Sequence, residues 1–217
     1  KRDQQDSPTI MVKGQELLTI KKFTYLGSTL SSDAQLDVEI TNRIAKASTS
    51  FGRLRATVWE RKGLMLKTKL KVYRAVVLTS LLYACETWTT YSRHEKVLNR
   101  FHINCLKKLL HVEWEDKIPD TEILERTGLP CIQTLLRKNR IRWAGHVTRM
   151  TDNRIPKQLL YCQLREGKRS VGRQKKRFKD SLKESLKEFG IDPSSWEVKA
   201  KNRPAWRSLT TQGAKRF

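Results

Sequence analysis

The 217-residue chain carries 45 Lys and Arg against 22 Asp and Glu, a formal net charge of +23 at pH 7. Such an excess needs a polyanion or a charged membrane surface to offset its self-repulsion. No apolar run approaches the roughly 20 residues that span a bilayer, and no signal-peptide pattern stands near the start. We therefore expect an intracellular protein whose partner is nucleic acid and not a membrane. The 38% hydrophobic content argues against wholesale disorder.

The charge is unevenly distributed along the chain. Residues 1–136 hold 22 basic and 15 acidic side chains, whereas residues 137–217 hold 23 and 7. The second part is therefore expected to carry most of the affinity for a polyanion. The chain opens at Lys1 and not at Met, which leads us to expect a piece of a longer reading frame.

Cysteine and histidine spacing favours neither a disulfide framework nor a metal site. The four cysteines are isolated and form no CxxC pair: Cys85, Cys105, Cys131 and Cys162. The densest His/Cys group does not complete a tetrahedral ligand set: His94, His102, Cys105 and His111. We expect reduced, mostly buried thiols and no bound metal.

The first elements are predicted to be a hairpin and three helices. Apolar alternation around a Lys13-Gly14 turn, followed by strand-forming residues up to Gly27, predicts one hairpin. Ser31, Ser32 and Asp33 are candidate caps of a helix whose apolar residues recur every three or four positions from Leu36 to Val58. A second stripe runs from Leu66 to Trp88, and a third helix begins at Ser92 with Glu95 completing a capping box.

The remaining chain is predicted to be helical and basic. A short helix at 121–127 ends at Gly128, and an amphipathic basic helix follows at about 131–150. A Gly- and Lys/Arg-rich loop at 165–177 leads into a helix with Phe178, Leu182, Leu186 and Phe189 on one stripe. The last stretch is predicted to be at most one short helix and a tail. The fold class is mainly α, with a hairpin at 1–30, a three-helix bundle at 31–117 and a basic region at 118–217.

Several short segments, taken in order, resemble the end of one family of polymerases. They are Ile10-Met-Val-Lys-Gly14, Phe23-Thr-Tyr-Leu-Gly27, Ile40-Thr-Asn-Arg-Ile44, Lys69-Leu-Lys-Val-Tyr73, Leu82-Tyr-Ala-Cys-Glu-Thr-Trp88, Ile141-Arg-Trp-Ala-Gly-His-Val-Thr-Arg-Met150, Gly172-Arg173 and Asn202-Arg-Pro-Ala-Trp-Arg207. Their order resembles the primer grip, thumb and C-terminal region of LINE-type (non-LTR) retrotransposon reverse transcriptases, of the clade that encodes an apurinic-type endonuclease. Gln174 and Phe178 depart from the Pro and Trp common after the family's Gly-Arg.

The resemblance implies a non-catalytic part of an RNA-directed DNA polymerase. In the family the catalytic aspartates and their Tyr-Ala-Asp-Asp signature precede the primer grip, and the chain has no such motif. We therefore expect no catalytic residue and no cofactor here, with Mg²⁺ held by the palm of the parent protein. The expected partners are an RNA template, a DNA primer or target DNA, and the rest of the polymerase, including its endonuclease. The expected location is the nucleus, and also the cytoplasm where element RNA is present.

The resemblance and the charge pattern together name the candidate contact residues. The primer-grip residues would be Phe23, Tyr25, Leu26 and Gly27. Guanidinium groups bind phosphate oxygens bidentately, so the predicted nucleic-acid contacts lie in the basic helix and the loop: Arg140, Arg142, His146, Arg149, Lys168, Arg169, Arg173, Lys175, Lys176 and Arg177. The loop, the most densely charged segment, is expected to be the principal phosphate-binding element, although such a run also suits nuclear import.

The residues alone favour one interpretation for each of three side chains and leave an alternative open for the whole chain. Trp143 suits the core better than a stacking platform, Trp88 suits the core, and Glu86 suits a cap or an ion pair with arginine better than acid catalysis. For the whole chain, the alternative to a polymerase part is a retroelement remnant kept by its host as a stand-alone nucleic-acid-binding module.

Overall fold

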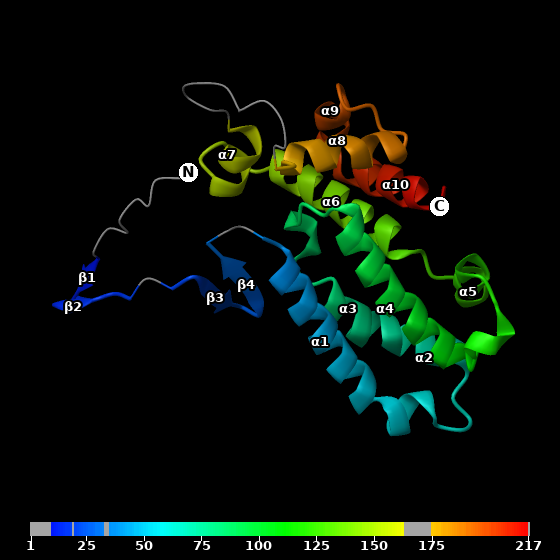
Figure 1. The fold of residues 1–217 in the computed structure, drawn as a ribbon. Coiled ribbons are helices and arrows are strands. Elements are labelled where there is room, and N and C mark those ends of the chain that lie inside the picture. The colour runs from blue at the N-terminus through cyan, green and yellow to red at the C-terminus, as the bar shows by residue number, and fades with distance from the viewer. Residues whose placement is uncertain (1–9, 19, 33–34, 163–174, 217) are drawn as a thin grey trace.

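The fold is a stack of helices with two small hairpins at its N-terminal side (Figure 1). The computed structural model describes residues 10–18, 20–32, 35–162 and 175–216. The chain is mainly α, as the sequence predicts: about 65% of it is helical. Within the described ranges no helix is both long enough and apolar enough to cross a membrane.

The N-terminal segment forms two hairpins where the sequence predicts one. β1 (Met11–Val12) pairs with β2 (Gln15–Glu16) around the Lys13-Gly14 turn, and β3 (Lys22–Tyr25) pairs with β4 (Ser28–Ser31). Leu26 and Gly27 have φ values of 47° and 81°, the two left-handed positions of a primed hairpin turn. Gly27 therefore reverses the chain and does not end the strand pattern, and Ser31 belongs to β4 and not to a helix cap.

The first core is the predicted three-helix unit with additions. α1 (Asp37–Arg53) continues as the π-helical η1 (Arg55–Trp59), and a second continuous helix is made of α2 (Leu66–Val72), η2 (Tyr73–Leu78) and α3 (Thr79–Leu81). After η3 (Cys85–Thr87), α4 (Ser92–Leu110) completes the bundle, and the short η4 (Trp114–Asp116) and α5 (Asp120–Thr127) follow. Tyr73, Val77, Leu81 and Leu98 are fully buried among these helices, so the removal of their apolar surface from water stabilises the bundle.

The start of α4 differs from the predicted capping box. Tyr91 precedes the first helical turn, so the side chain that caps the turn is that of His94, whose Nδ1 accepts from the Tyr91 N–H at 3.3 Å. Glu95 lies one residue too late for that contact. Its carboxylate instead accepts a hydrogen bond from the Thr90 hydroxyl at 2.9 Å.

A second core lies on the other side of α6 (Ile132–Thr148). It is closed by α7 (Ile155–Tyr161), α8 (Phe178–Glu188), α9 (Trp196–Lys201) and α10 (Arg203–Ala214). The sequence does not predict α7, and the last stretch is two helices instead of one short helix and a tail. Figure 1 shows α8, α9 and α10 grouped on one side of α6 and the bundle on the other. The predicted ranges 31–117 and 118–217 meet before α6, whereas the two cores meet inside it. The division of the chain at this point stays a prediction.

The bundle core predicts a large stability loss on truncation at Leu81. This side chain is fully buried, so Leu81→Ala should lower the free energy of unfolding by about 2–5 kcal/mol in urea denaturation. Val198→Ala, at a side chain that is 72% exposed in α9, is the control and should change it by less than about 0.5 kcal/mol. Ile44 is only half-buried, so its truncation should cost less than that of Leu81. Equal small effects at Leu81 and Val198 would contradict the bundle packing.

The buried His102 predicts loss of stability in mild acid. Its Nδ1 lies 2.8 Å from the Tyr73 hydroxyl, and burial lowers the pKa of His102 from 6.5 to about 4. Between pH 6.5 and 4, His102 is protonated in the unfolded chain but stays neutral in the folded chain. The stability that neutral His102 contributes is therefore complete above pH 6.5 and is lost as pH falls toward 4. The lost stability should be about 2–4 kcal/mol.

The control for this titration is His102→Gln, which lacks an ionisable group at the same position. The variant should be less stable than the wild type at pH 7, but its free energy of unfolding should fall less steeply between pH 6.5 and 4. Parallel pH profiles for the two proteins would rule out His102 as the source.

Candidate nucleic-acid interface

The β3–β4 hairpin presents aromatic side chains to solvent. Phe23 and Tyr25 are 50% and 59% exposed, and their rings stack with centroids 6.3 Å apart. Leu26, at the turn, is 73% exposed. Three of the four predicted primer-grip residues therefore form an open apolar surface, whereas Gly27 is half-buried. In an ordinary hairpin covered by a helix, such apolar side chains would pack in the core.

The back of the same hairpin is fastened to α1 by polar contacts, which we call the hairpin latch: Glu39, Asn42, Arg43 and Lys46. The Glu39 carboxylate accepts from the Thr29 N–H at 2.6 Å, and the Asn42 side-chain amide donates to the Thr29 hydroxyl at 2.9 Å. The Lys46 ammonium donates to the Gly27 carbonyl at 2.7 Å. Because these bonds hold the turn itself, they fix the direction in which the exposed rings point.

Arg43 is the centre of the hairpin latch. Its guanidinium pairs with Glu39 at 2.7 Å, and both side chains are 5% exposed. It also donates to the Ser28 hydroxyl at 2.7 Å and lies 4.6 Å from the centroid of the Tyr83 ring. A cation over an aromatic face is attracted by the ring quadrupole. One buried arginine thus joins the hairpin, α1 and the loop that follows α3.

Of the predicted contacts in and just after α6, two side chains are exposed and two are arginines with partners inside the protein. Arg149, the residue after α6, donates to the Ala200 carbonyl at 2.5 Å. Arg140 is 3% exposed and donates to the Ser185 hydroxyl at 2.8 Å, the Trp88 carbonyl at 3.1 Å and the Thr90 hydroxyl at 3.2 Å. Burial lowers the pKa of Arg140, while the neighbouring Glu95 opposes the shift. Its Nη1 and Nη2 donate inside the protein, and its buried Nε has no partner among the described residues. The guanidinium is thus not open to solvent, which corrects its place among the phosphate contacts. Arg142 and His146 are exposed, and Arg149 is half-buried.

The open residues of α6 share a groove with α10. The groove has a volume of about 540 Å³ and is lined by four arginines, one histidine, two tryptophans, one asparagine and one glutamate: Arg142, Arg149, Arg203, Arg207, His146, Trp143, Trp206, Asn139 and Glu86. We call it the α6–α10 groove. Glu86, expected in a cap or an ion pair, has neither among the described residues and contributes the one carboxylate of this lining.

Close packing of α10 on α6 brings the arginines of the two helices to the same groove. The indole N–H of Trp206 donates to the Ile141 carbonyl at 3.2 Å, and a Cβ at position 145 would lie 2.0 Å from that indole nitrogen. Only glycine at 145 therefore admits Trp206 at this depth. Trp143, half-buried, packs against the second core as predicted and also lines the groove.

The structure describes only the end of the basic loop, from residue 175 onward. Lys168, Arg169 and Arg173 lie outside the described residues, while Lys175 is exposed. Lys176 pairs with Glu184 at 2.5 Å, and Arg177 pairs with Asp180 at 2.9 Å. These two charges are partly offset by acids on α8, so the phosphate-binding role of the whole loop stays a prediction.

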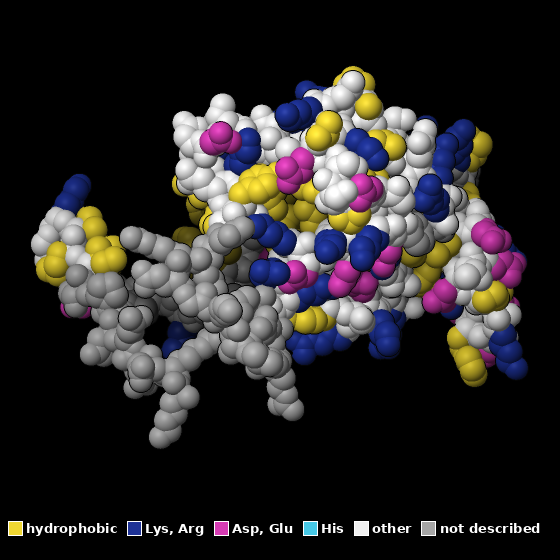
Figure 2. Space-filling model, turned by 90° about the horizontal axis from the view of Figure 1, so that it is seen from above, with side chains coloured by type: hydrophobic (Ala, Val, Ile, Leu, Met, Phe, Trp, Pro, Cys, Tyr) yellow, Lys and Arg dark blue, Asp and Glu magenta, His cyan; other side chains and the backbone are white. Residues whose placement is uncertain are grey.

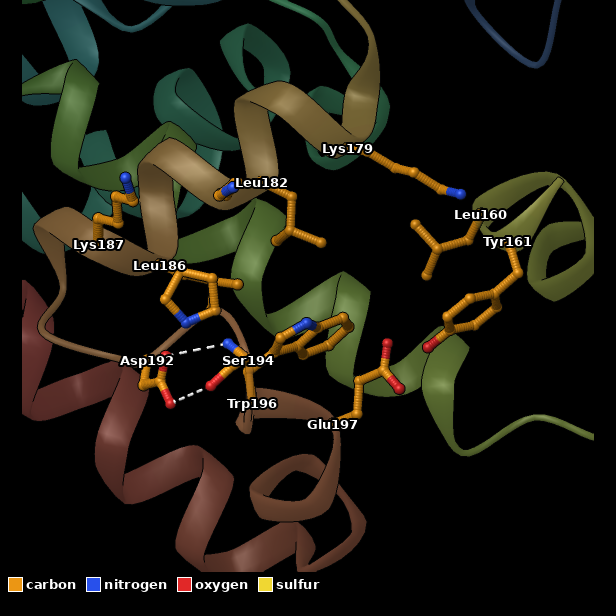
Figure 3. Close-up of a pocket in the computed structure, with 12 residues that line it drawn as sticks. Leu160, Tyr161, Lys179, Leu182, Leu186, Lys187, Asp192, Ser194, Trp196 and Glu197 are labelled. Carbon is orange, nitrogen blue, oxygen red and sulfur yellow. Dashed lines mark hydrogen bonds between the residues drawn. The ribbon is translucent and has the colours of Figure 1, made fainter. Parts of the chain in front are cut away.

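A second hollow, between α8 and the segment that leads into α9, is less suited to a polyanion. It measures about 640 Å³ and has Leu182, Leu186 and Trp196 among its lining residues. Figure 3 shows Lys179 and Lys187 on the α8 side and Asp192 and Glu197 on the other. Hydrogen bonds from Ser194 and Ser195 lower the pKa of Asp192 to about 2, so this carboxylate is engaged in the turn that precedes α9. The face in Figure 2 likewise mixes Lys and Arg with Asp and Glu.

Metal ligands and reactive thiols do not gather in the described parts of the chain. No group of three or more His, Cys, Asp or Glu side chains is placed there to hold a metal ion. All four cysteines are free. Cys85 and Cys105 are buried, Cys131 is half-buried and Cys162 is exposed.

The latch predicts that Arg43 is far more important for stability than an exposed ion pair. Arg43→Ala leaves the Glu39 carboxylate buried without its partner and should cost about 3–5 kcal/mol of unfolding free energy. Amide exchange at Thr29 should also accelerate, because this N–H donates to Glu39. Arg55→Ala breaks an exposed pair with Glu60 and should cost less than about 1 kcal/mol. Equal effects of the two substitutions would contradict the latch.

Sequence comparison finds a similar protein that is described as transposon-derived. Over 203 residues it is 24% identical to a putative uncharacterized transposon-derived protein, F52C9.6, of Caenorhabditis elegans. The alignment covers 89% of this chain and 71% of the nematode protein. No protein-family model matches the chain, and no solved structure matches it.

Proposed function

We propose that the chain is the primer-grip, thumb and basic C-terminal region of a reverse transcriptase encoded by a non-LTR retrotransposon. Its role is to hold primer and template beside a catalytic palm that supplies the aspartates and Mg²⁺. The similarity to a transposon-derived protein supports a transposable-element origin. The net charge of +23 supports a polyanionic partner.

The observation that carries the proposal is the hairpin with two differently built sides. Its rear is tied to α1 by hydrogen bonds, and its front exposes Phe23 and Tyr25. Exposed aromatic rings on a fixed backbone are suited to stack on unpaired bases or to support a strand end. The bundle behind the hairpin then serves as the rigid body that carries it, as a thumb does beside a palm.

Binding by this chain is expected to depend on phosphate contacts and to read little sequence. RNA template, DNA primer and target DNA are the proposed partners, with the nucleus as the proposed place of action and the cytoplasm where element RNA is bound. Because the chain has no Tyr-Ala-Asp-Asp motif, the purified protein should extend no primer with Mg²⁺ and deoxynucleotides. An upstream frame encoding the palm would favour the polymerase over a host-retained binding module.

The hairpin can be tested with a labelled primer–template that has a recessed 3′ end. Fluorescence anisotropy should show binding by the wild-type chain and an affinity loss of about 1–3 kcal/mol for Tyr25→Ala, the range for one stacked base. Leu18→Ala, at a side chain that is 89% exposed outside the strands, is the matched control and should bind as the wild type does. No affinity of the wild type for any nucleic acid at low salt would refute the proposal.

A further inference from the structure

The α6–α10 groove is made by two segments that lie far apart in the chain. Arg142, Trp143 and His146 come from α6, whereas Arg203 and Arg207 come from α10. Arg203 and Arg207 are four residues apart, so they lie on one face of α10. The contact between Trp206 and the Ile141 carbonyl sets the two helices against each other, which brings the charges of both to one place.

The positive charge of the groove is not balanced by the protein. Within the part of the chain that the structure describes, Arg142, Arg203 and Arg207 form no ion pair. Other basic residues of the same region do: Arg137 pairs with Glu188, and Lys157 pairs with Asp152. Unpaired guanidinium groups that converge on a hollow are donors for phosphate oxygens.

Neighbouring cations indicate that the field here is positive. Burial lowers the pKa of Lys138, and the nearby Arg142 and Arg74 lower it further. The carboxylate of Glu86 is the one acidic group among the described residues that line the groove. An anion entering the groove is therefore attracted by cations from both helices.

The aromatic side chains that line the groove indicate which kind of anion would bind there. Trp143 is half-buried, and its ring lies 5.4 Å from the ring of His146, which is exposed. A tryptophan beside phosphate-binding arginines suits a nucleotide whose base is not covered by a neighbour. The bases of a duplex are stacked on both sides, so only an unpaired strand can use this wall.

We infer that the α6–α10 groove is a binding site for one or two nucleotides of single-stranded nucleic acid, separate from the hairpin. Arg142, Arg203 and Arg207 bind the phosphates, and Trp143 stacks on a base. This inference rests on the proposed function, because it assumes a nucleic-acid partner. It adds a second point of contact away from the hairpin, suited to the template strand or to a displaced target strand.

The charge test compares two double substitutions that each remove two arginines. Arg203→Gln with Arg207→Gln alters the groove. The control, Arg53→Gln with Arg61→Gln, alters the end of α1 and the segment just after η1, and the end of α1 lies away from α10 (Figure 1). Binding of labelled 12-nucleotide oligo(dT) and oligo(rU) is measured by anisotropy over a range of salt concentrations. The groove variant should bind about tenfold or more weakly, and its salt slope should fall by about 0.7 for each phosphate that the variant no longer neutralises.

The stacking test compares Trp143→Leu with Trp114→Leu, whose tryptophan is 80% exposed at η4. Leucine keeps apolar packing but cannot stack, so the first variant should bind the single strands roughly 5- to 100-fold more weakly. Its affinity for a 12-base-pair duplex should not change, which separates stacking from a folding defect. The ratio of the oligo(dT) and oligo(rU) affinities shows whether DNA or RNA is the preferred source of the strand.

The outcomes separate this inference from the proposed function. In one outcome the wild type binds, but the groove substitutions weaken binding no more than the control substitutions do. This result would overturn the groove site and leave the polymerase proposal intact. A Trp143→Leu variant that loses duplex and single-strand affinity equally would overturn the stacking role. A wild-type chain that binds neither strand would overturn both the site and the proposed function.

Discussion

The relative position of the two cores depends on the hydrogen bonds of one buried guanidinium group, that of Arg140. It sits where α6 leaves the bundle and enters the second core, and it donates to Trp88 and Thr90 on one side and to Ser185 on the other. A charge buried this deeply is destabilising unless its donors are satisfied and opposite charge is near. Thr90 in turn donates to Glu95, so a chain of polar groups connects the arginine to an acid. Apolar contacts alone would hold each core together, but they would not fix the angle between the cores.

The hairpin and the α6–α10 groove are connected through the short segment after α3. Tyr83 lies under Arg43 of the hairpin latch, the Cys85 sulfur accepts from Asn139 of α6 at 3.3 Å, and Glu86 lines the groove. Ala84 adopts φ of 60°, an uncommon conformation for a residue with a Cβ, which turns the chain so that successive side chains face different partners. The relative positions of the two proposed contact surfaces are therefore set by a short stretch of packed backbone and not by a flexible linker.

The helical periodicity predicts most of the fold, because amphipathic spacing depends only on the local chain. The bundle, α5, α6 and α8 follow from it, and the burial of Trp88 follows from its apolar surroundings. The errors lie where a distant contact decides the local structure. The sequence of α9 and α10 does not indicate that Gly145 leaves room for Trp206, on which the position of α10 depends. The sequence places Arg140 at the surface because the basic residues of this amphipathic helix lie outside its apolar stripe. Only the tertiary structure shows which arginine turns inward.

Net charge consequently overstates the surface available to a polyanion. In α6 and the end of the basic loop, Arg137, Arg140, Lys176 and Arg177 are held by partners inside the protein, and their donors are less available to phosphate. The sequence does not distinguish paired from unpaired charges, so a prediction from sequence places the phosphate-binding site in the most densely charged segment, the basic loop. The structure instead favours the place where a few described guanidinium groups converge without an acidic partner, because the free energy of binding depends on donors that need not break an existing bond. This is the physical reason for preferring the groove over a charge run as a defined site.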